Sequence, residues 1–261
     1  MRHLRRPRNV GSGLFLGLML LYLFAPLALV VLFSFSTSPR SAFPPTAMTL
    51  DWYAKAFADT RFMPAFRNSV IAAAASAAVA GVIGTAFALG LVGVRTRVRN
   101  VASSITLLPA ILPGLLIGIA LTVFFLGIGV HLSLTTAIAG HVLIGLPFVI
   151  LTMNARMEGF DQSVLEAARD LGSSPVRVFR DITLPLIRPS VLGSMMLVMA
   201  ISLDEFVVTF FTVGSDQTLP VLIWAMLRRG IDPAVNAIAT VIIVGTVGLT
   251  VVAGRWARIR L

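Results

Sequence analysis

Long apolar runs, separated by short charged stretches, constrain this chain more than any other feature. Its 261 residues are 57% hydrophobic and only 12% charged, whereas roughly 25% of residues are charged in an average soluble domain. A water-soluble fold of this size would lack the polar side chains needed to cover its surface, and a disordered chain would be poor in apolar residues. The pattern therefore predicts an integral membrane protein and argues against a water-soluble enzyme.

Six of these runs are long enough to cross a bilayer, because a transmembrane helix needs about 20 mostly apolar residues. They predict an all-α, polytopic membrane protein with six transmembrane helices, formed as one domain over residues 1–261. The predicted spans are 14–33, 69–94, 105–130, 132–153, 189–213 and 234–253. The first run is interpreted as a retained span, since it is long and no A-x-A-like cleavage site follows it. Pro109 and Pro113 are expected to kink the third span.

The distribution of Arg and Lys residues predicts the orientation in the membrane. Most of them lie in the N-terminal segment, in the loops after the second and fourth spans, and in the C-terminal segment. Loops on the cytoplasmic side are enriched in these residues, so both termini are predicted to be cytoplasmic. Topology thus accounts for the net charge of +10. Nucleic-acid binding is not indicated, because the sequence shows no basic surface with interleaved aromatic residues.

No motif for catalysis, for a metal or for a cofactor is present in the sequence. The chain contains no Cys, so it has no thiolate ligand or cysteine nucleophile. His131 and His141 are interpreted as ordinary turn and span residues. The chain also lacks the G-x-x-x-x-G-K-[ST] phosphate-binding loop, so it cannot hydrolyse ATP by itself. We therefore predict no catalytic residue, no metal site and no cofactor.

The polar loop 154–188, between the fourth and fifth predicted spans, is too long for a simple connection. Ser163 and Glu166 form a capping-box pattern, which predicts a helix over 164–171 that stops at Gly172. A second short helix is predicted to follow. It would begin with the Ser-Pro pair at 174–175 as N-cap and first helical residue, and would end before the Leu-Pro pair at 184–185.

The same loop carries the pattern E-A-A-x3-G-x9-I-x-L-P. Its defining residues are Glu166, Ala167, Ala168, Gly172, Ile182, Leu184 and Pro185. At this spacing and between these two spans, it resembles the signature loop of the inner-membrane permeases of binding-protein-dependent ABC importers. The resemblance implies a type I ABC importer permease fold in a bacterial inner membrane, with 154–188 as a coupling loop that docks on a cytoplasmic ATPase. It also implies the partners: two ATP-binding subunits, a second homologous permease and an external solute-binding protein.

Two adjacent carboxylates, Asp204 and Glu205, lie inside the fifth predicted span. Ionisable residues in an apolar span are costly and commonly mark a substrate path or a partner. Phe206 and Phe210 follow one helical turn apart, and carboxylates beside aromatic faces suit an organic polycation. These four residues are candidates for the substrate path. The alternative is a structural role for the carboxylates, such as capping a broken helix or pairing with a second permease.

The segments 202–208 and 219–240 resemble the second permease subunit of spermidine/putrescine importers, with Glu205 where that subgroup commonly has Asp. The resemblance implies ATP-coupled import of polyamines by alternating access. Permeases for ferric iron, thiamine or phosphonates share parts of the pattern and remain alternatives. A stand-alone secondary transporter is a further alternative, although it would leave the signature loop without a purpose.

Overall fold

The structure is a computed structural model that describes residues 10–37, 45, 47–159, 163–229 and 233–259. These residues are helical almost throughout, and the isolated β-bridge found among them pairs Ser36 with Met48. The predicted all-α class is confirmed. The chain forms two compact units, Met63–Leu222 and Met1–Phe62 with Ile223–Leu261, and each is described by itself.

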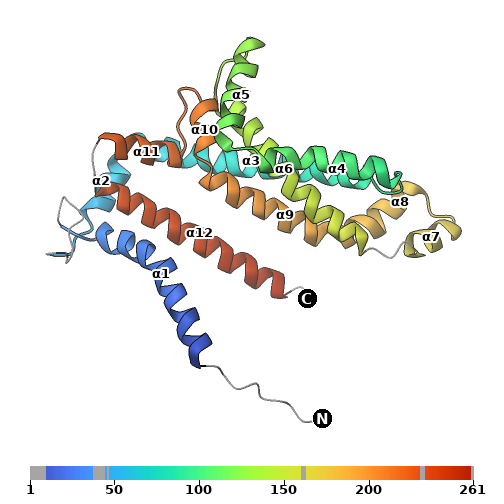
Figure 1. Ribbon diagram of the computed structural model, residues 1–261, viewed down its shortest axis with the longest axis horizontal. Coiled ribbons are helices and arrows are strands. Elements are labelled where there is room, and N and C mark those ends of the chain that lie inside the picture. The colour runs from blue at the N-terminus through green and yellow to red at the C-terminus, as the bar shows by residue number, and fades with distance from the viewer. Residues whose placement is uncertain (1–9, 38–44, 46, 160–162, 230–232, 260–261) are drawn as a thin grey trace. The chain divides into compact units, whose positions relative to one another are not determined.

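The unit Met63–Leu222 holds most of the helices that concern function (Figure 1). They are α3 (Phe62–Gly90), α4 (Thr96–Ile111), α5 (Gly114–Gly127), α6 (Leu134–Glu158), α7 (Ser163–Asp170), α8 (Pro175–Val178), the π-helical turn η1 (Phe179–Thr183), α9 (Leu184–Asp204), α10 (Val207–Thr212) and the start of α11 (Leu219–Arg229). Helices α3, α6 and α9 contribute one shared core. Its buried members are Ala77, Ala80, Ala88, Val142, Val149, Met153, Ile187 and Val198.

Glycines on α3 and α6 let this core close tightly. A Cβ added at Gly84 of α3 would lie 2.7 Å from Val149 of α6, and one added at Gly145 of α6 would lie 2.6 Å from Val198 of α9. Such distances leave no room for even a methyl group. Close backbone approach of this kind is how helices gain packing energy in lipid, where the hydrophobic effect does not drive them together.

Four described helices are long and apolar enough to span a membrane: Gly13–Ser34, Phe62–Gly90, Leu134–Glu158 and Pro175–Asp204. The pair α4 and α5 passes the same test only as one bent element. The chain is therefore a multi-pass membrane protein. Helix α12 (Ala234–Ile259) covers the sixth predicted span, and its described side chains reach Gly248. The count of six transmembrane helices stays a prediction.

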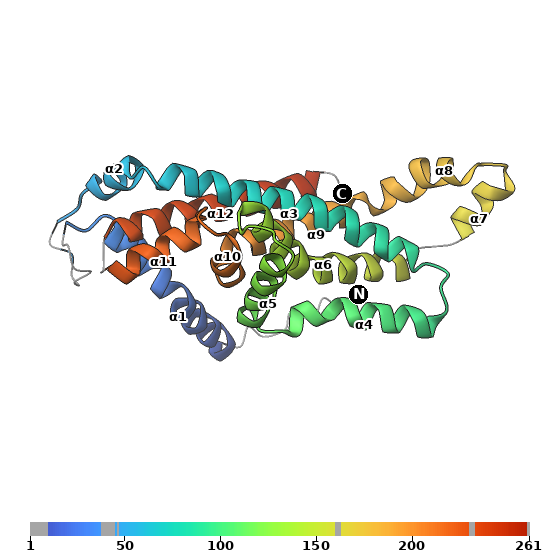
Figure 2. The ribbon, with the colours of Figure 1, turned by 90° about the horizontal axis from the view of Figure 1, so that it is seen from above.

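The predicted continuous span over 105–130 is corrected to two helices. Helices α4 and α5 meet at an angle of 101°, and in Figure 2 α5 turns away from the line of α4. Leu112 and Pro113 are both extended, with ψ values of 138° and 133°. Proline disfavours the helical region for the residue before it, so Pro113 breaks this element and does more than kink it.

The other unit contains α1 (Val10–Ser34), α2 (Asp51–Ala58) and α12, together with the last part of α11. The end of α1 is joined to α2 by polar contacts: the Trp52 indole N–H donates to the Ser36 carbonyl at 2.6 Å, and the hydroxyls of Ser34 and Tyr53 lie 2.7 Å apart. Apolar side chains along α1 are largely exposed, as expected for a helix that faces lipid.

Replacing Gly145 by Ala should destabilise the protein by about 1–3 kcal/mol, because the new methyl group would overpack the α6–α9 contact. The matched control is Gly193→Ala on α9, where an added Cβ meets nothing within 4 Å. Thermal loss of the monodisperse peak in size-exclusion chromatography measures the difference. Equal melting of the two variants would contradict the tight contact.

Candidate functional site

Helices α7 and α8 form a hairpin that closes at Gly172. The Gly172 N–H donates to the Arg169 carbonyl at 2.8 Å, and the Ser173 N–H donates to the Ala168 carbonyl at 3.1 Å. These two bonds are the Schellman pattern, which needs a left-handed residue directly after the helix. Gly172 has φ +80°. The predicted glycine stop is confirmed, and α7 begins one residue earlier than predicted, at Ser163.

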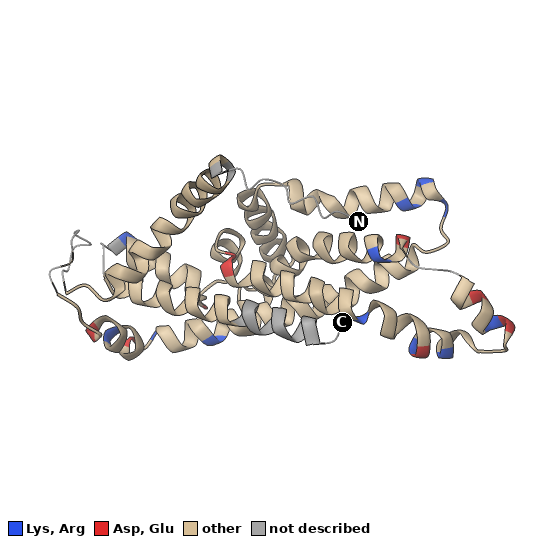
Figure 3. Ribbon diagram, turned by 90° about the horizontal axis from the view of Figure 1, so that it is seen from below, with Lys and Arg blue, Asp and Glu red and all other residues tan. Residues whose placement is uncertain are grey.

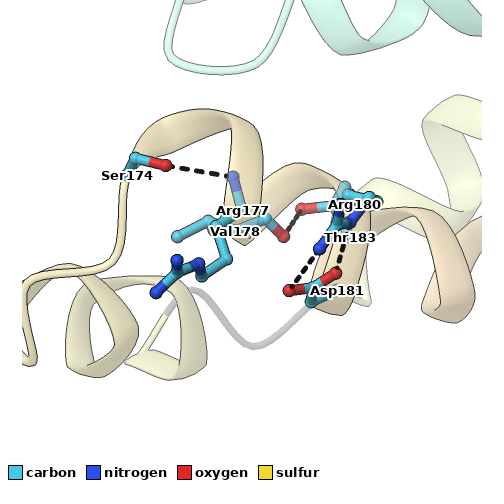
Figure 4. A network of polar contacts seen from close by, with 6 residues as sticks. All are labelled: Ser174, Arg177, Val178, Arg180, Asp181 and Thr183. Carbon is cyan, nitrogen blue, oxygen red and sulfur yellow. Dashed lines mark hydrogen bonds and ion pairs between the residues drawn. The ribbon is translucent and has the colours of Figure 1, made fainter.

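The second arm of the hairpin begins as predicted, with Ser174 as its N-cap and Pro175 as its first residue. The Arg177 N–H donates to the Ser174 hydroxyl at 3.4 Å, and Arg180 and Asp181 form an ion pair at 2.8 Å (Figure 4).

The predicted end of this arm before Leu184 is wrong. The helix continues through η1 into α9, so that Pro175–Asp204 is one uninterrupted helical element. In η1 the Leu184 N–H donates to the Phe179 carbonyl, five residues back. A proline ring clashes with the carbonyl four residues before it in an α-helix, and the wider π turn relieves that clash for Pro185.

The hairpin presents uncovered apolar side chains beside its charges. Leu171 is 87% exposed and Val176 is 76% exposed. The predicted coupling residues are distributed as follows: Glu166, Ala167, Gly172, Leu184 and Pro185 are exposed, whereas Ala168 and Ile182 are partly buried. Acidic and basic residues also gather on α7 and along α8 and η1 (Figure 3). Exposed apolar residues rimmed by charges are typical of a protein–protein interface.

The second part of the site is a break between α9 and α10, where sequence analysis predicted a continuous span over 189–213. Helix α9 ends at Asp204, Glu205 is extended with φ −70° and ψ 106°, and α10 begins at Val207. The prediction of one helix is therefore corrected. A helix end leaves backbone N–H and C=O groups without partners in their own helix, so the surrounding side chains decide whether such a break is stable.

The two carboxylates at this break have different surroundings. A carboxylate oxygen of Glu205 accepts a hydrogen bond from the Val208 N–H at 2.9 Å, and so caps the first turn of α10. Asp204 is exposed, and its side chain makes no hydrogen bond or ion pair with the described residues. Glu205 thus makes the helix-capping contact that the structural alternative predicted for the two carboxylates. The exposed Asp204 carboxylate is available to bind a ligand.

Aromatic rings lie directly after the carboxylates. Phe206 and Phe210 have ring centroids 5.6 Å apart, and Phe210 and Phe211 are 5.3 Å apart in an edge-to-face arrangement. The predicted pairing of Phe206 with Phe210 is confirmed, across a helix start and not along a continuous helix. Asp204 and this aromatic group together offer a negative charge and apolar faces to a ligand.

Hydroxyl groups from neighbouring helices hold α10 in place. Thr122 of α5 donates to the Phe211 carbonyl at 2.7 Å, and Thr136 of α6 donates to the Thr212 carbonyl at 2.6 Å. His141 of α6 is 3% exposed and contacts hydroxyls on both sides of the break. His141, interpreted from the sequence as an ordinary span residue, therefore has two specific partners. The available signal was an ionisable residue within an apolar span, which commonly has a specific partner.

Within the described part of the chain, no group of three or more His, Asp or Glu residues is placed to hold a metal ion. The arrangement pairs the His141 imidazole with the Ser202 and Thr209 hydroxyls, and all three side chains are buried. It offers an exposed docking surface at the α7–α8 hairpin. At the other end of the helical element Pro175–Asp204 it offers a helix break with a carboxylate and aromatic rings.

Spanning helices, an exposed hairpin between two of them and a carboxylate at a helix break are the features of a membrane transport subunit. The chain belongs to the family of binding-protein-dependent transport system inner membrane components, whose model matches residues 77–259. It is accordingly a transport subunit and not an enzyme.

Among its relatives are polyamine permeases. The chain is 33% identical over 233 residues to the spermidine/putrescine transport system permease protein PotC of Escherichia coli strain K12, covering 89% of this chain and 88% of that protein. PotC of Haemophilus influenzae is 33% identical over 231 residues, covering 88% and 90%. The putrescine transport system permease protein PotI of Escherichia coli strain K12 is 32% identical over 236 residues, covering 87% and 83%.

Solved structures confirm the fold. A bacterial ABC transporter involved in the import of the acidic polysaccharide alginate superimposes with a TM-score of 0.73 over 99% of both chains, at 16% identity. The MetNI methionine ABC transporter gives a TM-score of 0.60 over 77% of this chain and 98% of the other, at 14% identity. The fold is that of ABC importer permeases.

Glu205→Ala should lower stability by about 1 kcal/mol, because it removes the cap of α10. Glu205→Gln should retain stability, since its amide oxygen can still accept from Val208. Asp204→Asn should also leave stability unchanged. Thermal unfolding of the purified chain in detergent measures all three, and equal losses in the Ala and Gln variants would contradict the capping role.

Proposed function

We propose that this chain is the transmembrane permease subunit of an ATP-driven importer of polyamines, with spermidine and putrescine as the expected solutes. The proposed assembly contains two cytoplasmic ATP-binding subunits, a second permease and an external solute-binding protein. In this proposal the chain is one transmembrane domain of type I architecture, with both termini in the cytoplasm. The free Asp204 carboxylate at the break between α9 and α10 is the observation that carries the solute assignment.

A polyamine has the chemistry that this break can accept. Its ammonium groups need carboxylates or aromatic faces, and its methylene segments need apolar surface. Asp204 supplies an exposed negative charge, and Phe206 and Phe210 supply adjacent rings. Glu205 keeps its cap contact and adds negative potential nearby. The similarity to PotC and PotI supports the same class of solute.

Asp204→Asn should lower the uptake rate of radiolabelled putrescine and spermidine at least tenfold, because it removes the charge that attracts the ammonium group. A tenfold loss corresponds to about 1.4 kcal/mol, close to the lower end of what a hydrogen bond to a charged group contributes. Proteoliposomes with the complete transporter would measure uptake and ATP hydrolysis together. We expect less solute moved for each ATP hydrolysed.

Asp51→Asn on α2 is the matched control, since it also removes one exposed carboxylate. It should leave uptake unchanged. Normal polyamine uptake by Asp204→Asn would refute the substrate-path role. Absence of polyamine uptake by the unsubstituted transporter, with uptake of another solute, would refute the polyamine assignment and leave the permease assignment intact.

The α7–α8 hairpin is the proposed contact with the ATP-binding subunit. Its Leu171 and Val176 are largely exposed in the described part of the chain, and a partner surface would bury them. The uninterrupted helix Pro175–Asp204 joins the hairpin to the break that holds Asp204. A displacement of the hairpin would therefore be carried along this helix to the proposed substrate path. Two nucleotide states of the ATPase could bias two states of the permease through this contact.

Gly172→Asp should release the ATP-binding subunit and abolish uptake, because a side chain at φ +80° strains the hairpin by about 1–2 kcal/mol and places a carboxylate in the contact. Gly159→Asp is the control: this glycine lies at φ −87° with only a backbone oxygen at 3.9 Å. Co-purification with the ATP-binding subunit measures the contact.

A crosslink tests the same contact without disturbing it. The chain contains no Cys, so Leu171→Cys introduces a single reactive thiol. It should crosslink to the ATP-binding subunit with a thiol-to-amine reagent, whereas Val130→Cys, in the turn between α5 and α6, should not. Equal crosslinking at both positions, or none at Leu171→Cys, would contradict docking through the hairpin.

A further inference from the structure

A buried hydrogen-bond chain crosses the break between α9 and α10, and its centre is His141 of α6. The Nδ1 atom of His141 lies 2.5 Å from the Ser202 hydroxyl on α9, and the Nε2 atom lies 2.7 Å from the Thr209 hydroxyl on α10. The Thr209 hydroxyl donates in turn to the Glu205 carbonyl at 2.7 Å. Each of the three side chains is at most 5% exposed.

The donor and acceptor in each of these hydrogen bonds follow from the bond between Thr209 and the Glu205 carbonyl. Because the Thr209 hydroxyl gives its hydrogen to the Glu205 carbonyl, its oxygen must accept from His141, so Nε2 carries a proton. In the neutral imidazole Nδ1 then accepts from the Ser202 hydroxyl. A single ring thus joins the last turn of α9 to the first turn of α10, and through Thr209 it joins the extended Glu205 as well.

The backbone that carries His141 has little freedom to move. A Cβ added at the neighbouring Gly140 would lie 2.7 Å from Val208 of α10, nearly as close as the 2.6 Å found between Gly145 and Val198 of α9. Helix α6 is therefore packed tightly against α10 and α9 on either side of His141. A tightly packed backbone and hydrogen bonds to both sides of the break are what is needed to hold a nearby group in a fixed position.

We propose that His141 is a positioning residue for the substrate path. By joining Ser202 to Thr209, it fixes the break between α9 and α10, where Asp204 and the Phe206–Phe210 ring pair lie. This proposal rests on the proposed function for its effect on transport. His141 does not contact the solute itself, since it is buried behind α9 and α10. It determines where the free carboxylate stands relative to the rings, and so how well amines of different length fit.

The test compares two substitutions of His141. The Phe variant keeps a ring of similar shape without polar atoms, and the Gln variant keeps one donor and one acceptor. The first readout is the labelling rate of Val207→Cys, at the start of α10, by a small methanethiosulfonate reagent in the assembled transporter. The second is the ratio of spermidine to putrescine uptake. Thr152→Val, which removes a hydroxyl with only a local bond on α6, serves as the control.

We expect the Phe variant to change the labelling rate and the uptake ratio at least threefold, with the Gln variant and the Thr152 control near the unsubstituted values. Labelling of Val130→Cys should not change. An unaltered labelling rate and uptake ratio in the Phe variant would overturn the proposal. So would an equal fall in uptake of both amines with unaltered labelling, since that is the result of a general loss of stability.

The two readouts separate this proposal from the function on which it rests. If the unsubstituted transporter moves no polyamine, the proposed solute fails, whereas labelling at Val207→Cys still reports whether His141 holds the break. If the Phe variant assembles poorly, Ser202→Ala removes one bond of the same chain, and it should shift labelling in the same direction.

Discussion

Backbone polar groups cannot be left unpaired in a bilayer, and this constraint governs the break between α9 and α10. The break at Asp204–Phe206 frees carbonyl and N–H groups within an apolar bundle. In the break itself Glu205 caps the first turn of α10 and its carbonyl accepts from Thr209, and at the other end of α10 Thr122 of α5 and Thr136 of α6 bond the last carbonyls. Irregular backbone at membrane depth is tolerated only where protein or a cavity satisfies it, so the break exists because its neighbours complete it.

Tight packing keeps those neighbours in reach. Gly84, Gly140 and Gly145 allow α6 to approach α3, α10 and α9 so closely that one methyl group would disturb each contact. At such distances a hydroxyl or an imidazole on α6 meets the backbone or side chains of the next helix directly. The break and the α7–α8 hairpin are also joined directly, because α9 is the continuation of α8 through η1. Docking surface and proposed substrate path thus lie on one continuous helical element.

Local patterns predicted local structure well. The stop at Gly172 and the N-cap at Ser174 depend on residues within one turn of each other, and both are found as expected. Pro113 was recognised as a disturbance, but the 101° bend exceeds what a kink would give. The π turn before Pro185 was missed, since a proline near a predicted helix start is compatible with either a new helix or a continued one.

The sequence by itself determined that this chain lies in a membrane, that it is helical, and that an exposed hairpin interrupts its apolar spans. These properties follow from composition and from short-range patterns, which act without reference to the rest of the fold. Only the tertiary structure decided that Asp204 and Glu205 have different surroundings and that His141 joins two helices. Ser202 and Thr209 lie 61 and 68 residues from His141 along the chain, and no local pattern encodes a contact that depends on how three helices pack.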